Sequence, residues 1–121
     1  MINGIIIKQF NAVVRKTIDK YSEKYKSAVS LMISPKINSP ELRIQILSNY
    51  RPVEEIGIKD LDIPFISPKI VENKILTGIQ KIADENALKK PAVLLINEGD
   101  IKPYLYDSGK TVSKLNLEKL L

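Results

Sequence analysis

Residues 29–46 read VSLMISPKINSPELRIQI, and this stretch decides the fold. Large aliphatic residues occupy every second position near both of its ends, at Val29, Leu31, Ile33, Leu42, Ile44 and Ile46. This period of two predicts two strands that each bury one face, and the two Ser-Pro steps between them predict a loop. We expect the strands to pair antiparallel, so one face of the pair must be covered by another layer.

A helix that can supply this layer is predicted before the first strand. Its apolar residues recur at spacings of three and four, at Ile6, Phe10, Val13, Val14, Thr17, Ile18, Tyr21 and Tyr25. At about 100° per residue these side chains share one side of a helix, and charged residues occupy the other side. Asn3 is expected to cap this helix, because its side chain can accept a hydrogen bond from a backbone N–H of the first turn.

After the quoted stretch the hydrophobic pattern weakens. It predicts only a short strand near residues 53–59, which could lie at the edge of the sheet. A second helix is expected from Pro68 to about Asn86, with Ser67 as its cap. Its inward positions are Val71, Ile75, Ile79 and Ile82. Within this helix, Gly78 is either a point of close packing or a modest destabilisation.

The C-terminal part of the chain predicts two more strands. The apolar run at residues 92–96 indicates a strand buried on both faces, which places it centrally in the sheet. Residues 97–100 have the composition of a turn, and residues 101–106 return as the partner strand. Pro103 lacks a backbone N–H, so it is expected at a sheet edge or at a position without a ladder hydrogen bond.

Residues 107–110 form a second predicted turn, and a short closing helix is expected after it, with Ser113 or Asn116 as its cap. The elements then follow the order α-β-β-(β)-α-β-β-α. We therefore predict one α+β domain over residues 1–121, with a mostly antiparallel sheet of four to five strands and two amphipathic helices on one face. No internal repeat is visible in the sequence.

The chain contains neither cysteine nor histidine among its 121 residues. The lack of cysteine excludes disulfides and thiolate metal sites. The lack of histidine removes the commonest general base and the commonest zinc ligand. We therefore expect a non-enzymatic protein with no catalytic residues, no cofactor and no metal site. No apolar run reaches the roughly 18–20 residues of a membrane span, and a cytoplasmic location is expected.

The net charge is +5, and most of the excess lies on the first predicted helix. Its polar side carries four basic residues that could contact phosphates, namely Arg15, Lys16, Lys20 and Lys24. The alternative is a solvated helix face with ordinary ion pairs, such as Arg15 with Asp19. The sequence favours this alternative, because no run of five or more like charges occurs and no aromatic residues alternate with the basic ones.

A candidate protein-interface patch is formed by Lys102, Tyr104 and Tyr106, which share one face of a predicted strand. If that strand is at an edge, the patch suits a protein partner, because tyrosine is enriched in interface cores. The alternative is that both tyrosines pack under the closing helix, with their hydroxyls in water.

Two short motifs that suggest enzymes are rejected on their spacing. Residues 109–111, Gly-Lys-Thr, resemble the end of a phosphate-binding loop, but Tyr104 stands where that loop needs another glycine. Residues 100–102, Asp-Ile-Lys, resemble part of the metal site of restriction-type nucleases, but no other aspartate is suitably placed to complete it.

The leading hypothesis is a protein-binding domain, adaptor or chaperone-like, that forms a homodimer through a helix or an exposed sheet edge. It depends on the missing catalytic residues, the apolar C-terminal segment and a sheet face without a predicted cover. The alternative is a small basic nucleic-acid-binding protein that contacts phosphates with its first helix.

Overall fold

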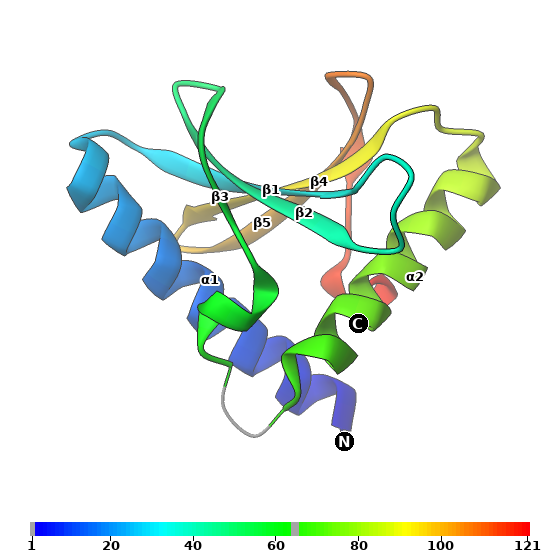
Figure 1. Cartoon of the computed structure of the whole chain (residues 1–121), viewed down its shortest axis with the longest axis horizontal. Coiled ribbons are helices and arrows are strands. Elements are labelled where there is room, and N and C mark those ends of the chain that lie inside the picture. The colour runs from blue at the N-terminus through cyan, green and yellow to red at the C-terminus, as the bar shows by residue number, and fades with distance from the viewer. Residues whose placement is uncertain (1, 64–65) are drawn as a thin grey trace.

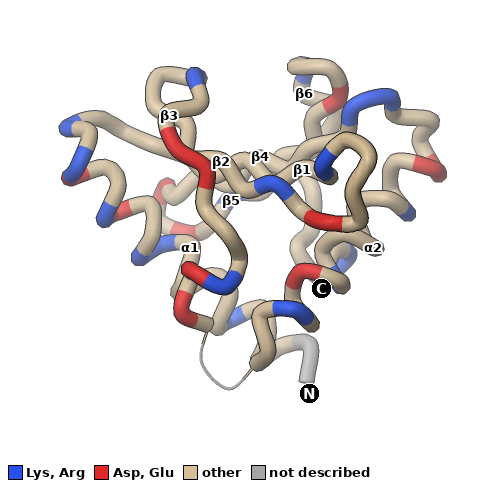
Figure 2. Tube along the Cα trace, in the orientation of Figure 1, with Lys and Arg blue, Asp and Glu red and all other residues tan. Residues whose placement is uncertain are grey.

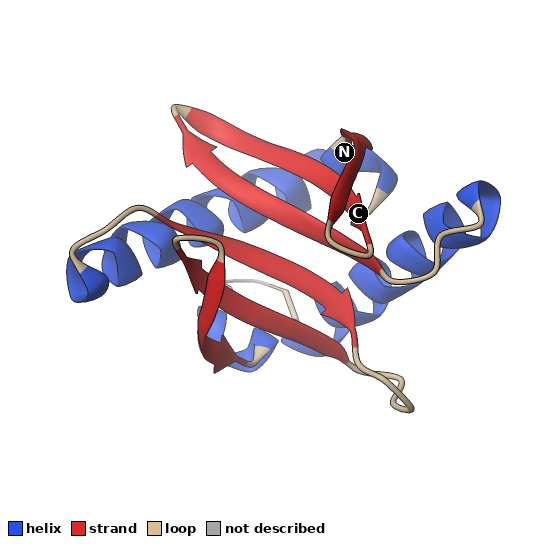
Figure 3. Ribbon diagram, turned by 90° about the horizontal axis from the view of Figure 1, so that it is seen from above, coloured by secondary structure: helices blue, strands red, loops and turns tan. Residues whose placement is uncertain are grey.

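The computed structural model describes residues 2–63 and 66–121. Its elements are α1 (Ile2–Tyr25), β1 (Val29–Pro35), β2 (Leu42–Ser48), β3 (Arg51–Ile56), the 3₁₀ turn η1 (Ile58–Leu61), α2 (Pro68–Asn86), β4 (Pro91–Glu98), β5 (Asp100–Asp107), β6 (Lys110–Lys114) and the 3₁₀ turn η2 (Leu117–Lys119). The strands form one antiparallel sheet in the order β3-β2-β1-β4-β5-β6. Both long helices lie on the same face of this sheet (Figures 1 and 3). The predicted α+β domain is confirmed, with one strand more than expected.

The hairpin β1–β2 forms as the alternation in residues 29–46 predicts. Its register pairs Val29 with Ser48 and Pro35 with Leu42. The large aliphatic positions of both strands are buried, because they face the helices. The strand β4 lies beside β1 in the centre of the sheet, and four consecutive residues, 92–95, are buried in it. The prediction of a central strand buried on both faces is therefore confirmed, although the helices cover only one face and neighbouring side chains of the sheet bury β4 on the other.

The core lies between the sheet and the two helices. Helix α1 contributes Phe10 and Val14, and helix α2 contributes Ile75 and Ile79, all at 2% exposure or less. These residues belong to the two apolar stripes that the spacings of three and four predict. On α2, Gly78 lets the backbone of Leu120, directly after η2, approach the helix closely.

Several predicted boundaries need correction. Helix α1 begins at Ile2, so Asn3 lies inside the helix and is not its cap. Helix α2 begins at Pro68 and ends at Asn86 as predicted, although the Ser67 side chain makes no capping hydrogen bond. The edge strand β3 lies at Arg51–Ile56, a few residues before the predicted 53–59.

The largest error concerns the end of the chain. Residues 110–114 form the edge strand β6, which sequence reasoning did not predict. The closing helix is only the single 3₁₀ turn η2, whose cap is Asn116, with its Oδ1 accepting from the Glu118 N–H at 3.0 Å. Pro103 lies in β5, an interior strand, and its carbonyl accepts from Leu115 N–H on the β6 side. Its missing N–H therefore costs no hydrogen bond to β4, as the second of the two predicted options requires.

The fold consists of two copies of one unit, although the sequence shows no repeat. The first copy is α1-β1-β2-β3-η1 and the second is α2-β4-β5-β6-η2. The two central strands pair antiparallel with Met32 opposite Leu94, so a pseudo-twofold axis passes between these residues. Each copy has a register shift at the same place in its outer hairpin, at Ile46/Leu47 and at Leu105/Tyr106.

Backbone conformations repeat as well. The β2–β3 turn has positive φ at Asn49 and Tyr50, and the β5–β6 turn has positive φ at Ser108 and Gly109. Two successive positive φ values are the signature of a type I′ hairpin turn. The duplication is therefore a property of the backbone, and the side chains that the two copies carry differ.

No helix in residues 2–63 and 66–121 is long and apolar enough to cross a membrane.

Candidate functional site

The face of the sheet opposite α1 and α2, which we call the open face, receives every second side chain of each strand. Leu31 and Leu95 pair across β1 and β4 and belong to the core with the helices. Met32 and Leu94, the next pair, therefore point to the open face. Leu94 is only 1% exposed although it lies outside the core cluster, so its neighbours on the open face already cover it.

One row of side chains crosses the open face from edge to edge. The pairing of the six strands aligns Glu55, Gln45, Met32, Leu94, Tyr104 and Lys114 in that order. The two ends are exposed and carry opposite charge, and the middle is apolar. An apolar centre with charged side chains at its rim is the usual layout of a protein-binding surface.

The structure brings the predicted patch residues Lys102, Tyr104 and Tyr106 together on the open face of β5, where all three are half-buried. The condition that their strand lies at an edge is not met, because β6 pairs with its outer side. The alternative, in which both tyrosines pack under the closing helix, is excluded as well, because η2 packs on the helix side, where Leu117 and Leu120 belong to the core. Lys102 forms an ion pair with Glu98 at 3.4 Å.

Two hairpin turns flank the open face. Figure 1 shows the turns β2–β3 and β5–β6 rising on the side of the sheet away from the helices. Tyr50 lies in the first turn and is 86% exposed. Val53 and Val112 are the extra residues at the two register shifts, and they are 39% and 45% exposed. Equivalent positions of the two copies thus present an aliphatic side chain to water.

The predicted phosphate-contacting face of α1 is divided by its contacts. Arg15 donates to the Gly99 carbonyl at 2.7 Å and lies 3.5 Å from the Asp100 carboxylate. Arg15 therefore pairs with residues at the β4–β5 turn, and the prediction that it pairs with Asp19 is wrong. Lys24 donates to Glu54 of β3 at 2.7 Å. Arg15 and Lys24 therefore hold strands against α1, which is a structural role.

Lys16 and Lys20 are exposed and border a cavity of about 520 Å³ between α1 and η1. The same cavity is lined by Asp60 and Asp62. Their carboxylates reduce the positive potential that two lysines would otherwise create. Figure 2 shows that basic positions are spread over both helices and several turns, and do not concentrate on one surface.

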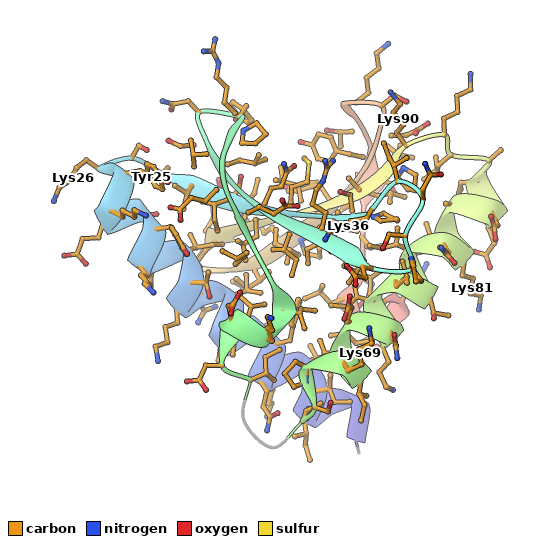
Figure 4. All side chains as sticks on the ribbon, in the orientation of Figure 1. Tyr25, Lys26, Lys36, Lys69, Lys81 and Lys90 are labelled. Atoms are coloured by element: carbon orange, nitrogen blue, oxygen red, sulfur yellow. The ribbon has the colours of Figure 1, made fainter. Side chains whose placement is uncertain are left out.

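A cluster around Glu54 joins α1 to β3. The Glu54 carboxylate accepts hydrogen bonds from Lys24 and from the Tyr25 hydroxyl, and Tyr21 stacks on Tyr25 with ring centroids 6.5 Å apart. The bonds from Lys24 and then Tyr25 lower the pKa of Glu54. The bond to Glu54 also raises the pKa of Lys24 and the pKa of Tyr25. Figure 4 labels Tyr25 at the C-terminal end of α1.

Four surface cavities form two pseudo-symmetric pairs, which agrees with the duplication in three dimensions. The cavity beside η1 and α1 has its counterpart beside η2 and α2, and the other two lie at the ends of β3 and β6. Their linings differ: Thr17 in the first corresponds to Gly78 in its counterpart. Among the described residues no group of three or more acidic side chains is placed to hold a metal ion.

Sequence reasoning missed the charged ends of the central row. Glu55 falls within the strand predicted near residues 53–59, and Lys114 falls between Ser113 and Asn116, the two predicted caps of the closing helix, but the sequence analysis assigns neither of them to a site. Every residue of β6 is exposed, so its sequence has no apolar alternation that could have revealed a strand. Arg43, the pseudo-symmetric counterpart of Lys102 on the open face, was recognised only as a polar position of a strand.

Compared with models of protein families, with curated proteins and with solved structures, the chain has no match.

Proposed function

We propose that this protein is a non-enzymatic protein-binding domain, adaptor or chaperone-like, which forms a homodimer through its open face. The observation that carries the proposal is the uneven covering of the sheet. Both helices pack on one face, and the other presents half-buried Met32, Tyr104 and Tyr106 between charged ends. Aromatic residues and methionine are enriched at the cores of protein interfaces, and charged residues are depleted there.

As the dimer interface, the open face is favoured over the helix and the sheet edge that the sequence analysis considers. The outer sides of the helices carry charged residues, which suit contact with water. The edge strand β6 carries Lys110 and Lys114, and the edge strand β3 carries Pro52. Lysine and proline at an edge disfavour the addition of a further strand.

The proposal is tested by the mass of the particle in solution, measured by size-exclusion chromatography with light scattering over a dilution series. We expect a dimer that dissociates on dilution, and Tyr104→Ala and Met32→Ala should each weaken it about tenfold or more. Ile70→Ala is the matched control, because Ile70 is an apolar side chain 51% exposed on α2. A strict monomer at about 100 μM, far above the Kd of a specific dimer, would contradict the homodimer.

The alternative function, binding of nucleic acid through α1, is supported by the exposed Lys16 and Lys20. Phosphate contacts predict an affinity that falls steeply with salt. A titration with single-stranded and double-stranded DNA and RNA at two salt concentrations compares the wild type with the double variant Lys16→Glu, Lys20→Glu. Indifference to both the salt and the substitutions would eliminate this function.

A further inference from the structure

We propose that a second molecule of this protein docks on the open face after a half-turn about an axis parallel to the strands, so that Glu55 of each molecule lies opposite Lys114 of the partner subunit. This inference rests on the proposed function, and it specifies how the open faces of the two molecules are oriented.

The charges at the ends of the central row motivate the orientation. Glu55 of β3 and Lys114 of β6 are both exposed, and they occupy equivalent positions in the two copies of the fold. The pseudo-twofold axis therefore relates a negative end of the row to a positive end. Such a row is complementary to its own reverse.

A symmetric dimer must bring the same patch of both molecules together, and a twofold axis relates the two patches. For two sheets that meet face to face with their strands aligned, this axis lies in the plane between them, close to the strand direction or close to its perpendicular. An axis along the strands reverses the row, so both ends meet a residue of opposite charge. An axis across the strands keeps the row, so Glu55 meets Glu55 of the partner subunit and Lys114 meets Lys114 of the partner subunit. Repulsion at both ends disfavours this second arrangement.

The shape of the sheet permits the preferred arrangement. A twisted sheet is saddle-shaped, and Figure 1 shows two turns, β2–β3 and β5–β6, rising from it. A half-turn about an axis along the strands, or about one across them, superposes the curvature of one saddle on that of the other. The two surfaces can therefore fit together. Shape is satisfied by both axes, and charge selects between them.

The remaining contacts of the reversed row fit the same orientation. Half-buried Met32 comes to lie above the partner's Leu94, which its own neighbours already cover, so Met32 supplies the accessible apolar group at the centre. Arg43 lies at the corner of the open face beside Ser34, and the reversal places it opposite the partner's Tyr106. A guanidinium over a tyrosine ring is a favourable pairing, most of all when it is desolvated.

Cross-linking tests the orientation directly, because the chain has no cysteine of its own. Glu55→Cys and Lys114→Cys are made in separate chains, mixed and treated with a thiol-specific bifunctional cross-linker that spans about 10 Å, the separation of two sheets packed face to face, which is too long for a direct disulfide. In the proposed orientation the mixture forms cross-linked dimers of one chain of each kind, and neither variant links to itself, because the two thiols would lie at opposite edges of the sheet. Self-linking of Glu55→Cys would overturn the orientation in favour of the axis across the strands.

Charge reversal provides a second measurement. Glu55→Lys and Lys114→Glu should each raise the dimer dissociation constant about tenfold, because each places two pairs of like charges in contact. The chain that carries both substitutions should return to the wild-type value. Lys81→Glu and Glu85→Lys on α2 are the matched controls, and Figure 4 shows Lys81 pointing away from the sheet. Circular dichroism establishes that each variant is folded.

The outcomes separate this inference from the proposed function. A wild-type monomer contradicts both. A wild-type dimer that Tyr104→Ala weakens, but that neither single charge reversal affects, supports the open face as the interface and overturns the orientation.

Discussion

Gly78 of α2 lies against the backbone of Leu120, so that a Cβ added to the glycine would stand 2.8 Å from the Leu120 Cα and 2.9 Å from its carbonyl oxygen. Both opposing atoms belong to the backbone and cannot rotate away. Gly78 is therefore a point of close packing, which decides between the two interpretations that the sequence allowed.

We expect Gly78→Ala to lower the free energy of unfolding by about 1–3 kcal/mol, because overpacking outweighs the gain in helix propensity. Urea titration followed by circular dichroism measures this change. Gly4→Ala in α1 is the matched control, since outside its own helical turn no atom of the described residues lies within 4 Å of its added Cβ. This control should raise stability by up to about 1 kcal/mol. An increase in stability for Gly78→Ala as well would contradict the close approach.

Tyr50 has a φ of 63° and is 86% exposed, whereas its counterpart in the second hairpin is Gly109. A left-handed conformation costs a non-glycine residue roughly 1–2 kcal/mol, and glycine recovers part of this. Tyr50→Gly is therefore expected to raise the free energy of unfolding by about 0.5–1 kcal/mol, measured by urea titration at a concentration where the chain is monomeric. Gly109→Ala should have the opposite effect. Loss of stability in Tyr50→Gly would show that the exposed ring makes contacts that offset its strain.

The Glu54 cluster predicts a dependence of stability on pH. The pKa of Glu54 is lowered in the folded protein, chiefly by the hydrogen bond from Lys24 and then by that from Tyr25. Its carboxylate therefore contributes to stability above the ordinary pKa of 4.5, and the contribution is lost as the pH falls through the lowered value. The urea midpoints of wild type and Glu54→Gln should differ at pH 7, and the difference should shrink as the pH falls below the ordinary pKa of a glutamate. Glu85→Gln, which removes an exposed carboxylate of α2, is the control, and an unchanged gap at low pH would contradict the mechanism.

Arg15 ties α1 to the turn between β4 and β5 through its 2.7 Å hydrogen bond to the Gly99 carbonyl. Arg15→Ala is expected to cost about 0.5–1 kcal/mol of unfolding free energy, the usual range for such a bond at the surface. Asp100→Ala should cost less, because its carboxylate is fully exposed and lies 3.5 Å away. Thermal and urea unfolding give both values. Equal stability of Arg15→Ala and the wild type would leave Arg15 available as a phosphate contact.

Periodicity succeeded wherever one side of an element is buried. The stripes of α1 and α2 and the alternation of β1 and β2 arise from contact with one core, so burial imposes its period on the sequence. It failed in β6, where all five residues are exposed and the strand is held by backbone pairing with β5. Backbone hydrogen bonds place no demand on side-chain polarity, so such a strand leaves little trace in the sequence.

Local spacing was also enough to predict part of the candidate site. Lys102, Tyr104 and Tyr106 could be grouped from the sequence, because residues two apart share a face of any strand. Their combination with Met32, Glu55 and Lys114 needed the strand order, which brings together segments far apart in the chain. The duplication was also hidden, since turns, register shifts and cavities carry it, while equivalent positions carry different side chains, such as Gln45 and Tyr104 or Glu55 and Lys114.

By itself, the sequence determined the class of the domain, most of its helices and strands, and a surface without imidazole or thiol, because residue type and local spacing are enough for these. Only the tertiary structure decided which of the basic residues on α1 are held by partners and which face of the sheet stays uncovered. The reason is that strand order and charge pairing depend on contacts between residues distant in sequence, and no local pattern records them.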